Sequence, residues 1–294
     1  MVKFLVILDT LIITERMDLT KVYILSSGDK DFSALSYNKR VLSQHSNIVF
    51  QRIDFQKGAN FNKLANYRDF LNKLQEDSFV ILIDATDVIC INSDINKMYQ
   101  DFSTMNLEIV FGAEKGTCYA FGFNSNQQIR EECELWHEIY NLGEVNFDEE
   151  KPVGRTWLKN PFLLNSGMMC GYAGSISNFL NDVINGATKG YIDDQKVNFH
   201  SKVSDQICIT QTILKCKKYH KTISIDKESK LFHNIAPFKY DFVNQKISTA
   251  NKTLNPYFIH FPGSCLMHSQ IKQFKSSFGF VENSGLLDFN LISS

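Results

Sequence analysis

The chain has 294 residues and a mass of 33.8 kDa, which is enough for one large α/β domain or two small ones. Hydrophobic residues make up 44% and charged residues 21%, a globular composition that excludes a disordered chain, a collagen-like repeat or a coiled coil. The 31 basic and 32 acidic residues nearly balance and form no basic stripe, so nucleic acid is not expected as a partner.

Cysteines and targeting signals exclude several further classes. The seven cysteines are scattered and contain no C-x-x-C pair, so neither a zinc site nor a redox pair is predicted. The apolar run Phe4–Leu8 is too short for a signal peptide and is read as a first buried strand. No segment reaches the roughly 18 apolar residues of a transmembrane helix. The residues alone therefore predict a cytoplasmic protein without a membrane span.

Short apolar runs alternate with helix-like segments along the first 115 residues. The uniformly apolar run Phe79–Ile83 is typical of a central parallel strand that is covered on both faces. Residues Asn62–Leu74 have the apolar spacing of an amphipathic helix. This alternation predicts a doubly wound open sheet. Its other strands are expected at Lys21–Ser26, Ile48–Ile53 and Leu107–Gly112.

The second part of the chain is less regular. Residues 117–161 read as long loops with one helix around Ile129–Tyr140, and loops of this length usually carry functional residues. An apolar strand at Phe162–Tyr172 follows, and mixed β structure ends the chain. The remaining elements are expected at Ile176–Ile184 and Asp205–Lys215 for helices, and near Thr222–Ile225, Lys230–Asn234 and Pro256–His260 for strands. Because no linker or internal repeat is visible, residues 1–294 are predicted to form one domain.

Two carboxylates, Asp84 and Asp87, come directly after the apolar run Phe79–Ile83. Open α/β sheets bind their ligands at the carboxyl ends of strands. Carboxylate oxygens suit Mg²⁺ or Mn²⁺, which can bridge to the oxygens of a diphosphate. The alternative is structural, with one Asp capping the next helix and the other in a turn. The common G-x-G-x-x-G, Walker A, G-x-S-x-G and H-E-x-x-H motifs are absent.

Three further segments place polar side chains where a ligand can reach them. Asn165 and its neighbours Ser166 and Gly167 interrupt an apolar strand, so that backbone and amide can approach a ligand closely. Asp205 opens a helix, where it is either an N-cap or a carboxylate that points into a cleft. His260 ends a strand before the loop residue Gly263, although a lone His of this kind is more often a core residue.

In this order, the segments resemble the glycosyltransferase domain of the multifunctional procollagen lysyl hydroxylases, a collagen hydroxylysine glycosyltransferase of GT-A type. The resemblance spans nearly the whole chain. The family motifs D-x-x-D, S-A-E, L-N-S-G-G and D-D-Q are similar to Asp84-Ala-Thr-Asp87, Gly112-Ala-Glu114, Leu164-Asn165-Ser166-Gly167-Met168 and Ser204-Asp205-Gln206. Its L-D…I-F-Q-N and the metal-ligating His of its H-G-N-G are similar to Ile225-Asp226, Leu231-Phe232-His233-Asn234 and His260.

The resemblance implies a fold and a set of ligands. The fold would be a GT-A-like α/β domain with a Rossmann-type mixed sheet and helices on both faces. Residues 1–115 would form its nucleotide-binding half and residues 116–294 its acceptor and sugar half. The implied site residues are Asp84, Asp87 and His260 for Mn²⁺, Lys63, Asp84 and Gly263 for the UDP-sugar donor, and Asp205, Glu114 and Asn165 as catalytic residues.

The implied reaction is retaining transfer of glucose from UDP-glucose to galactosyl-hydroxylysine of collagen or a collagen-like polypeptide. Transfer of galactose or another UDP-sugar to hydroxylysine or a different acceptor is one alternative, and inversion would then need a general base. A non-catalytic module that binds sugar nucleotide or collagen is another. The resemblance also implies the lumen of the endoplasmic reticulum and allows a homodimer.

The sequence departs from the family pattern at several positions. Asn66 stands where the family has an aromatic residue, Ser204 replaces the first Asp of the acidic pair, and the Lys of the family's last motif is missing after Gly263. A second register would place Asp193-Asp194-Gln195 on the acidic motif instead of Asp205. The helix that follows Asp205 favours the first register. The departures leave the donor sugar open.

Overall fold

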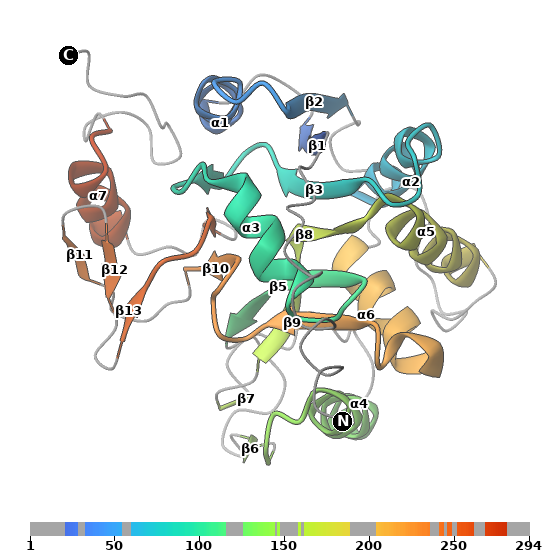
Figure 1. The fold of residues 1–294 in the computed structure, drawn as a ribbon. Helices are drawn as coiled ribbons and strands as arrows, with labels where there is room; N and C mark the ends of the chain where they lie inside the picture. The colour runs from blue at the N-terminus through green and yellow to red at the C-terminus, as the bar shows by residue number, and fades with distance from the viewer. Residues whose placement is uncertain are drawn as a thin grey trace, which may run out of the picture.

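The computed structural model describes residues 21–28, 33–54, 60–115, 126–144, 146–147, 158–159, 162–188, 204–235, 241–243, 246–248, 252–261 and 268–280. Within these ranges a mixed sheet of six strands, in the order β2-β1-β3-β8-β5-β9, forms the centre of the fold (Figure 1). β1, β2 and β3 are parallel, β8 is antiparallel to both of its neighbours, and β9 is parallel to β5. The strands are β1 (Val22–Gly28), β2 (Ile48–Asp54), β3 (Phe79–Asp84), β5 (Ile109–Lys115), β8 (Phe162–Tyr172) and β9 (Ile223–Asp226).

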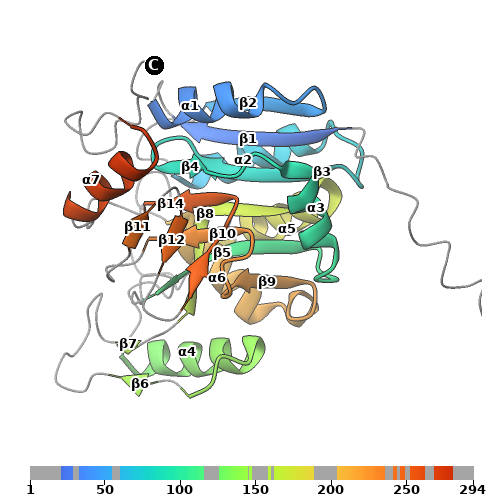
Figure 2. The same ribbon diagram turned by 60° about the vertical axis from the view of Figure 1, so that its left-hand side comes forward.

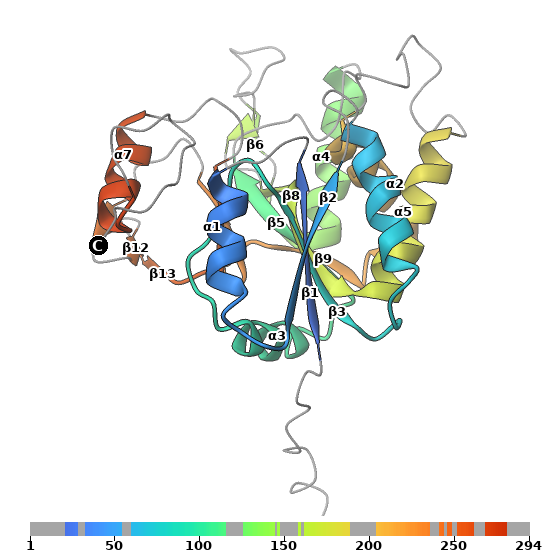
Figure 3. The same ribbon diagram turned by 90° about the horizontal axis from the view of Figure 1, so that it is seen from above.

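Helices cover both faces of the sheet, with α2 and α5 on one side and α1 on the other (Figure 3). The side chains of β3 show why both faces must be covered. Val80 and Leu82 belong to the core under α2 and α5, whereas Ile81 and Ile83 belong to the core under α1 and α3. Successive side chains of a strand point to opposite faces, so an all-apolar strand is stable only between two layers. The helices are α1 (Ser33–Leu42), α2 (Asn60–Leu71), α3 (Ile95–Ser103), α4 (Asn126–Tyr140), α5 (Ala173–Thr188) and α6 (Asp205–Lys215).

A small sheet lies beside the main one, with the order β10-β14-β4 (Figure 2). β14 (Phe258–His260) is parallel to β10 (Phe232–Asn234) and antiparallel to β4 (Val88–Cys90). β4 begins directly after Asp87 and β14 ends with His260. This pairing therefore brings together two polar residues that lie far apart in the sequence.

The last elements form an aromatic layer at the edge of the molecule. An antiparallel sheet of β11 (Asp241–Val243), β12 (Lys246–Ser248) and β13 (Thr253–Leu254) lies beside α7 (His268–Ser277). Their apolar side chains share a core with Ala34 of α1, Ile89 of β4 and Ile259 of β14. Short pieces complete the described chain: β6 (Asn146–Phe147), β7 (Leu158–Lys159) and the 3-10 helix Lys217–Tyr219.

The predicted α/β domain, with a mixed sheet and helices on both faces, is confirmed. One expectation is wrong in detail. The run Phe79–Ile83 does not form a purely parallel strand, because it pairs antiparallel with β8 on its other side. The main sheet was expected from residues 1–115 alone. It instead also contains β8 and β9, which come from residues 116–294. Phe4–Leu8 lies outside the described residues. None of the described helices combines the length and the apolar character needed to cross a membrane.

Candidate metal centre and active site

The candidate site lies at the carboxyl ends of β1 and β3. Asp84 is the last residue of β3 and stands beside Ser27 of β1, whose Oγ donates a hydrogen bond to Asp84 Oδ1 at 3.1 Å. From β1 the chain continues to β2 on one side, and β3 lies on the other side. Such a reversal of strand order is the place where open α/β sheets bind their ligands.

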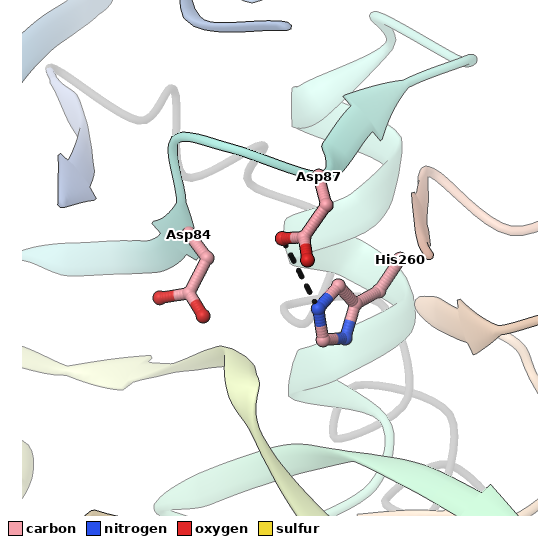
Figure 4. Close-up of side chains that lie close together, drawn as sticks. All are labelled: Asp84, Asp87 and His260. Atoms are coloured by element: carbon pink, nitrogen blue, oxygen red, sulfur yellow. Dashed lines mark ion pairs between the residues drawn. The ribbon is translucent and has the colours of Figure 1, made fainter. Parts of the chain in front are cut away.

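Asp84, Asp87 and His260 converge at this edge (Figure 4). One carboxylate oxygen of each Asp and one imidazole nitrogen all lie within 4.8 Å of one another. Nε2 of His260 is 3.3 Å from Oδ1 of Asp87. A cation with ligands at about 2.1 Å in octahedral geometry places adjacent ligand atoms about 3 Å apart. The separation of these two atoms therefore fits two adjacent ligands of one ion.

The chemistry of the donor set gives a second test. Oδ1 of Asp87 is buried and accepts no hydrogen bond within the described part of the chain. Because buried polar atoms normally have a partner, this oxygen is a candidate ligand for a cation. Two carboxylates and one imidazole form a mixed oxygen and nitrogen set. Such a set suits a transition metal ion such as Mn²⁺ better than Mg²⁺, which takes oxygen ligands. The three predicted ligands thus lie where one metal ion can reach them all.

The charges at this centre depend on one another. Burial alone would lower the pKa of His260, but the carboxylates of Asp87 and Asp84 raise it above its ordinary value. Burial raises the pKa of Asp84, and the ammonium group of Lys63 opposes that shift. The ammonium group of Lys63 thus offsets part of the negative charge of this centre. A divalent cation would offset more of it.

Lys63 of α2 joins the metal centre to a second carboxylate. Its Nζ lies 2.9 Å from Asp84 Oδ1 and 2.6 Å from Asp205 Oδ2, and the residue is only 4% exposed. Burial alone would lower the pKa of Lys63, but Asp205 and Asp84 raise it well above its usual value. Lys63 is therefore a fixed positive charge at the point where the sequence predicts donor contact.

Asp205 is the first residue of α6, and it is not the N-cap. The N-cap is Ser204, which makes no side-chain capping hydrogen bond. The structural alternative for Asp205, a helix N-cap, is therefore wrong. Its carboxylate is buried and turns toward Lys63. Asp205 is thus linked through Lys63 to Asp84 of the metal centre, whereas Asp194 of the second register lies outside the described residues.

Glu114 is held by two side-chain amides. Asn165 Nδ2 donates to Oε2 at 2.7 Å, and Gln206 Nε2 donates to Oε1 at 2.9 Å. Asn165 also accepts a hydrogen bond from the backbone N–H of Gly167 at 2.9 Å, so its side chain is held at both ends. The carboxylate of Glu114 is thereby fixed in orientation. Asn165 lies within one continuous strand, β8, beside an irregularity in its pairing with β5.

Some residues of the site could not be singled out from the sequence, and one prediction stays untested. Ser27, Gln206 and Asn234 contact predicted site residues. Gln206 and Asn234 belong to segments that resemble family motifs but were given no role, and Ser27 has no such signal. Gly263 lies outside the described residues. Its contact with the donor therefore remains a prediction.

No protein-family model and no curated protein sequence matches the chain. Among solved structures, a similar one is described as the crystal structure of a glycosyltransferase involved in the glycosylation of the major capsid of PBCV-1. It has 11% sequence identity and a TM-score of 0.42, and the match covers 83% of this chain and 96% of that chain. A TM-score this low does not establish a common fold, and none of these comparisons supports membership of the procollagen lysyl hydroxylase family.

Proposed function

We propose that this protein is a metal-dependent glycosyltransferase that takes its sugar from a nucleoside diphosphate sugar. The observation that carries the proposal is the convergence of Asp84, Asp87 and His260 at the point where the strand order of the sheet reverses. Transfer of the sugar leaves negative charge on the departing diphosphate. A divalent cation at this site would neutralise that charge as a Lewis acid.

The chain's own residues then have separate tasks. Asp84, Asp87 and His260 would hold the cation, which we propose to be Mn²⁺. Lys63 supplies a buried positive charge next to Asp84, on the side where phosphate or ribose oxygens of the donor would lie. A bound cation and the ammonium group of Lys63 together would suit a highly negative ligand such as a diphosphate.

Asp205 and Glu114 would face the sugar and the acceptor. Asp205 is paired with Lys63, and both oxygens of Glu114 accept amide hydrogen bonds. Carboxylates that are already paired in this way are suited to stabilise the positive charge of a developing oxocarbenium centre. They are less suited to act as a general base that removes a proton. We therefore favour transfer with retention of configuration over inversion with a general base.

The donor and the acceptor follow from the resemblance of the motifs. We propose UDP-glucose as donor and galactosyl-hydroxylysine of a collagen-like polypeptide as acceptor, with UDP-galactose or another UDP-sugar as the alternative donor. One departure from the family bears on the choice of donor sugar. Asn66 donates its side-chain amide to the backbone oxygen of Asp54 at 2.6 Å, so a polar group tied to the end of β2 stands where the family has an aromatic ring. A homodimer remains a prediction.

The proposal is tested by a donor screen that measures release of UDP. UDP-glucose, UDP-galactose and other UDP-sugars are supplied with and without Mn²⁺, and with and without a collagen-like peptide that carries galactosyl-hydroxylysine. We expect Mn²⁺-dependent release with UDP-glucose that increases when the peptide is present. Mn²⁺-dependent binding of UDP-sugar without turnover on any acceptor would favour the non-catalytic module. Failure to bind either Mn²⁺ or UDP would refute the proposed function.

A further inference from the structure

Asn234, which ends β10, lies directly beside His260, which ends β14. The two residues are register partners in the parallel pair of β10 and β14, and both are buried. Asn234 Oδ1 is 2.7 Å from His260 Nδ1, the ring nitrogen that does not face Asp87. Asn234 thus contacts the predicted metal ligand His260 at the ring nitrogen that points away from the metal centre.

The orientation of the Asn234 amide is set by the main sheet. Its Nδ2 donates a hydrogen bond to the backbone oxygen of Ala113 in β5 at 2.9 Å. A flipped amide would place two oxygen atoms against each other at that point, because a carbonyl oxygen can only accept. The amide oxygen therefore faces His260, and it can only accept a hydrogen bond from Nδ1.

Of the two contacts that the ring nitrogens make, the one to Asn234 Oδ1, at 2.7 Å, is shorter than the one to Asp87 Oδ1, at 3.3 Å, and it selects one form of the imidazole. A neutral imidazole carries its proton on only one nitrogen. With the proton on Nδ1, the lone pair is on Nε2, the atom 3.3 Å from Asp87 Oδ1 in the metal centre. Metal-binding histidines are generally held in this way by a hydrogen bond from the other ring nitrogen, which fixes both tautomer and ring orientation.

Two glycines leave room for this arrangement. A Cβ at Gly112 would lie 2.9 Å from Asn234 Nδ2, and a Cβ at Gly167 would lie 2.5 Å from His260 Cε1. Any side chain at either position would displace the amide or the ring. The hydrogen bonds that link Ala113, Asn234 and His260 thus require glycine at Gly112 of β5 and Gly167 of the neighbouring strand β8.

We propose that Asn234 is the positioning residue of the metal centre, which holds His260 as the Nδ1–H tautomer with Nε2 directed at the cation. The inference rests on the proposed function for the identity of the site as a metal centre. Asn234 does not itself bind the metal. Loss of such an outer partner typically lowers metal affinity by about 10- to 100-fold.

The test compares wild type with Asn234→Ala by two measurements. In metal-free protein, ¹⁵N NMR at a pH where imidazole is neutral reads the tautomer of His260, whose signal is assigned by its loss in His260→Gln. Titration with Mn²⁺ then gives the affinity. We expect the Nδ1–H tautomer in wild type, a mixture in Asn234→Ala, and a loss of Mn²⁺ affinity of about 10- to 100-fold. The control is Asn72→Ala, which removes an amide that follows α2 and accepts a hydrogen bond from Ser177 of α5, and it should keep wild-type affinity.

The outcomes separate this inference from the proposed function. If wild type binds no divalent cation, the proposed function fails, while the NMR comparison still shows whether Asn234 sets the tautomer. If wild type binds Mn²⁺ and Asn234→Ala binds it equally well, the inference is wrong. The tautomer measured in the wild type alone covers the case in which the Ala variant fails to fold. An Nε2–H tautomer in the wild type would overturn the inference without any variant.

Discussion

Asp87 is predicted to serve the metal centre without supporting the core. Its side chain lies in the turn between β3 and β4, and Oδ1 accepts no hydrogen bond in the described residues, although its backbone oxygen accepts one from Phe261 at 2.9 Å. Asp87→Ala should therefore abolish Mn²⁺-assisted binding of UDP in calorimetry. The melting temperature of the metal-free protein should not fall, because the change also removes a negative charge beside Asp84.

The matched control for this variant is Asp69→Ala, which removes an exposed carboxylate of α2 that pairs with Arg68. It should leave Mn²⁺-assisted UDP binding unchanged. Undiminished binding in Asp87→Ala would remove this residue from the metal site and would restore its interpretation as a turn residue.

Asp205 offers a test of catalysis as distinct from binding. Asp205→Asn keeps the size of the side chain but removes its negative charge, and Lys63 retains Asp84 as a counter-charge. We expect kcat to fall by about 10²-fold or more, the usual scale for one positioned electrostatic group, with UDP-sugar binding nearly intact. Turnover equal to wild type would exclude Asp205 from the reaction. A parallel Asp194→Asn variant tests the second register.

At the scale of single residues, the sequence pointed to side chains whose position follows from a strand end. Asp84 and Asp87 follow an apolar run, and His260 ends another, so their place at the edge of a sheet could be predicted. Asn234 could not be identified as the partner of His260. Its position depends on the register of β10 against β14 and on a backbone oxygen of β5, and no local pattern encodes either.

At the scale of elements, composition predicted the type of a segment better than its direction. The apolar run Phe162–Tyr172 forms β8 with the expected bounds, but an apolar run does not reveal that β8 is antiparallel to β3 and β5. α7 was expected as β structure. Ile271, Phe274 and Phe278 have the three- and four-residue spacing of a helix, and the first two are buried, but the many polar residues between them obscured that pattern.

An interaction between elements also predicts a dependence of stability on pH. Asp101 of α3 accepts a hydrogen bond from the hydroxyl of Tyr257, the residue before β14, at 2.7 Å, and another from Lys97. Partial burial would raise the pKa of Asp101, but these hydrogen bonds hold it below its ordinary value. The ionised carboxylate therefore stabilises the fold above the unfolded pKa of about 3.9, and this contribution disappears as the pH falls through the folded pKa.

Asp101→Asn should accordingly lower the free energy of unfolding near pH 7, and the difference from wild type should shrink below about pH 4. Because the Asp101 side chain is 32% exposed, solvent screening limits the expected difference to less than about 1 kcal/mol. Denaturant unfolding of both proteins across this pH range measures it. A difference that does not change with pH would show that the charge of Asp101 contributes nothing.

At the scale of the whole molecule, the metal centre connects the main sheet with the small sheet. Asp84 ends a strand of the main sheet, whereas His260 ends a strand of the small sheet. The two sheets already share an apolar cluster, which contains Ile83 of β3 and Phe258 of β14, and Asn234 donates a hydrogen bond from β10 to β5. A bound cation would add a further link between the two sheets. No pattern in the sequence could show this, because it depends on how the sheets pack.

Metal binding should therefore be visible in the stability of the whole domain. A ligand that binds only the folded protein at 100 times its Kd adds about 2.7 kcal/mol to the free energy of unfolding. For a domain of this size, that corresponds to a rise in melting temperature of roughly 5 °C. We expect this rise for wild type with Mn²⁺ in excess, a smaller one for Asn234→Ala at the same concentration, and none for Asp87→Ala. Because all three ligands must be assembled by folding, an equal rise in Asp87→Ala would show that Mn²⁺ stabilises the protein at some other place than between these two sheets.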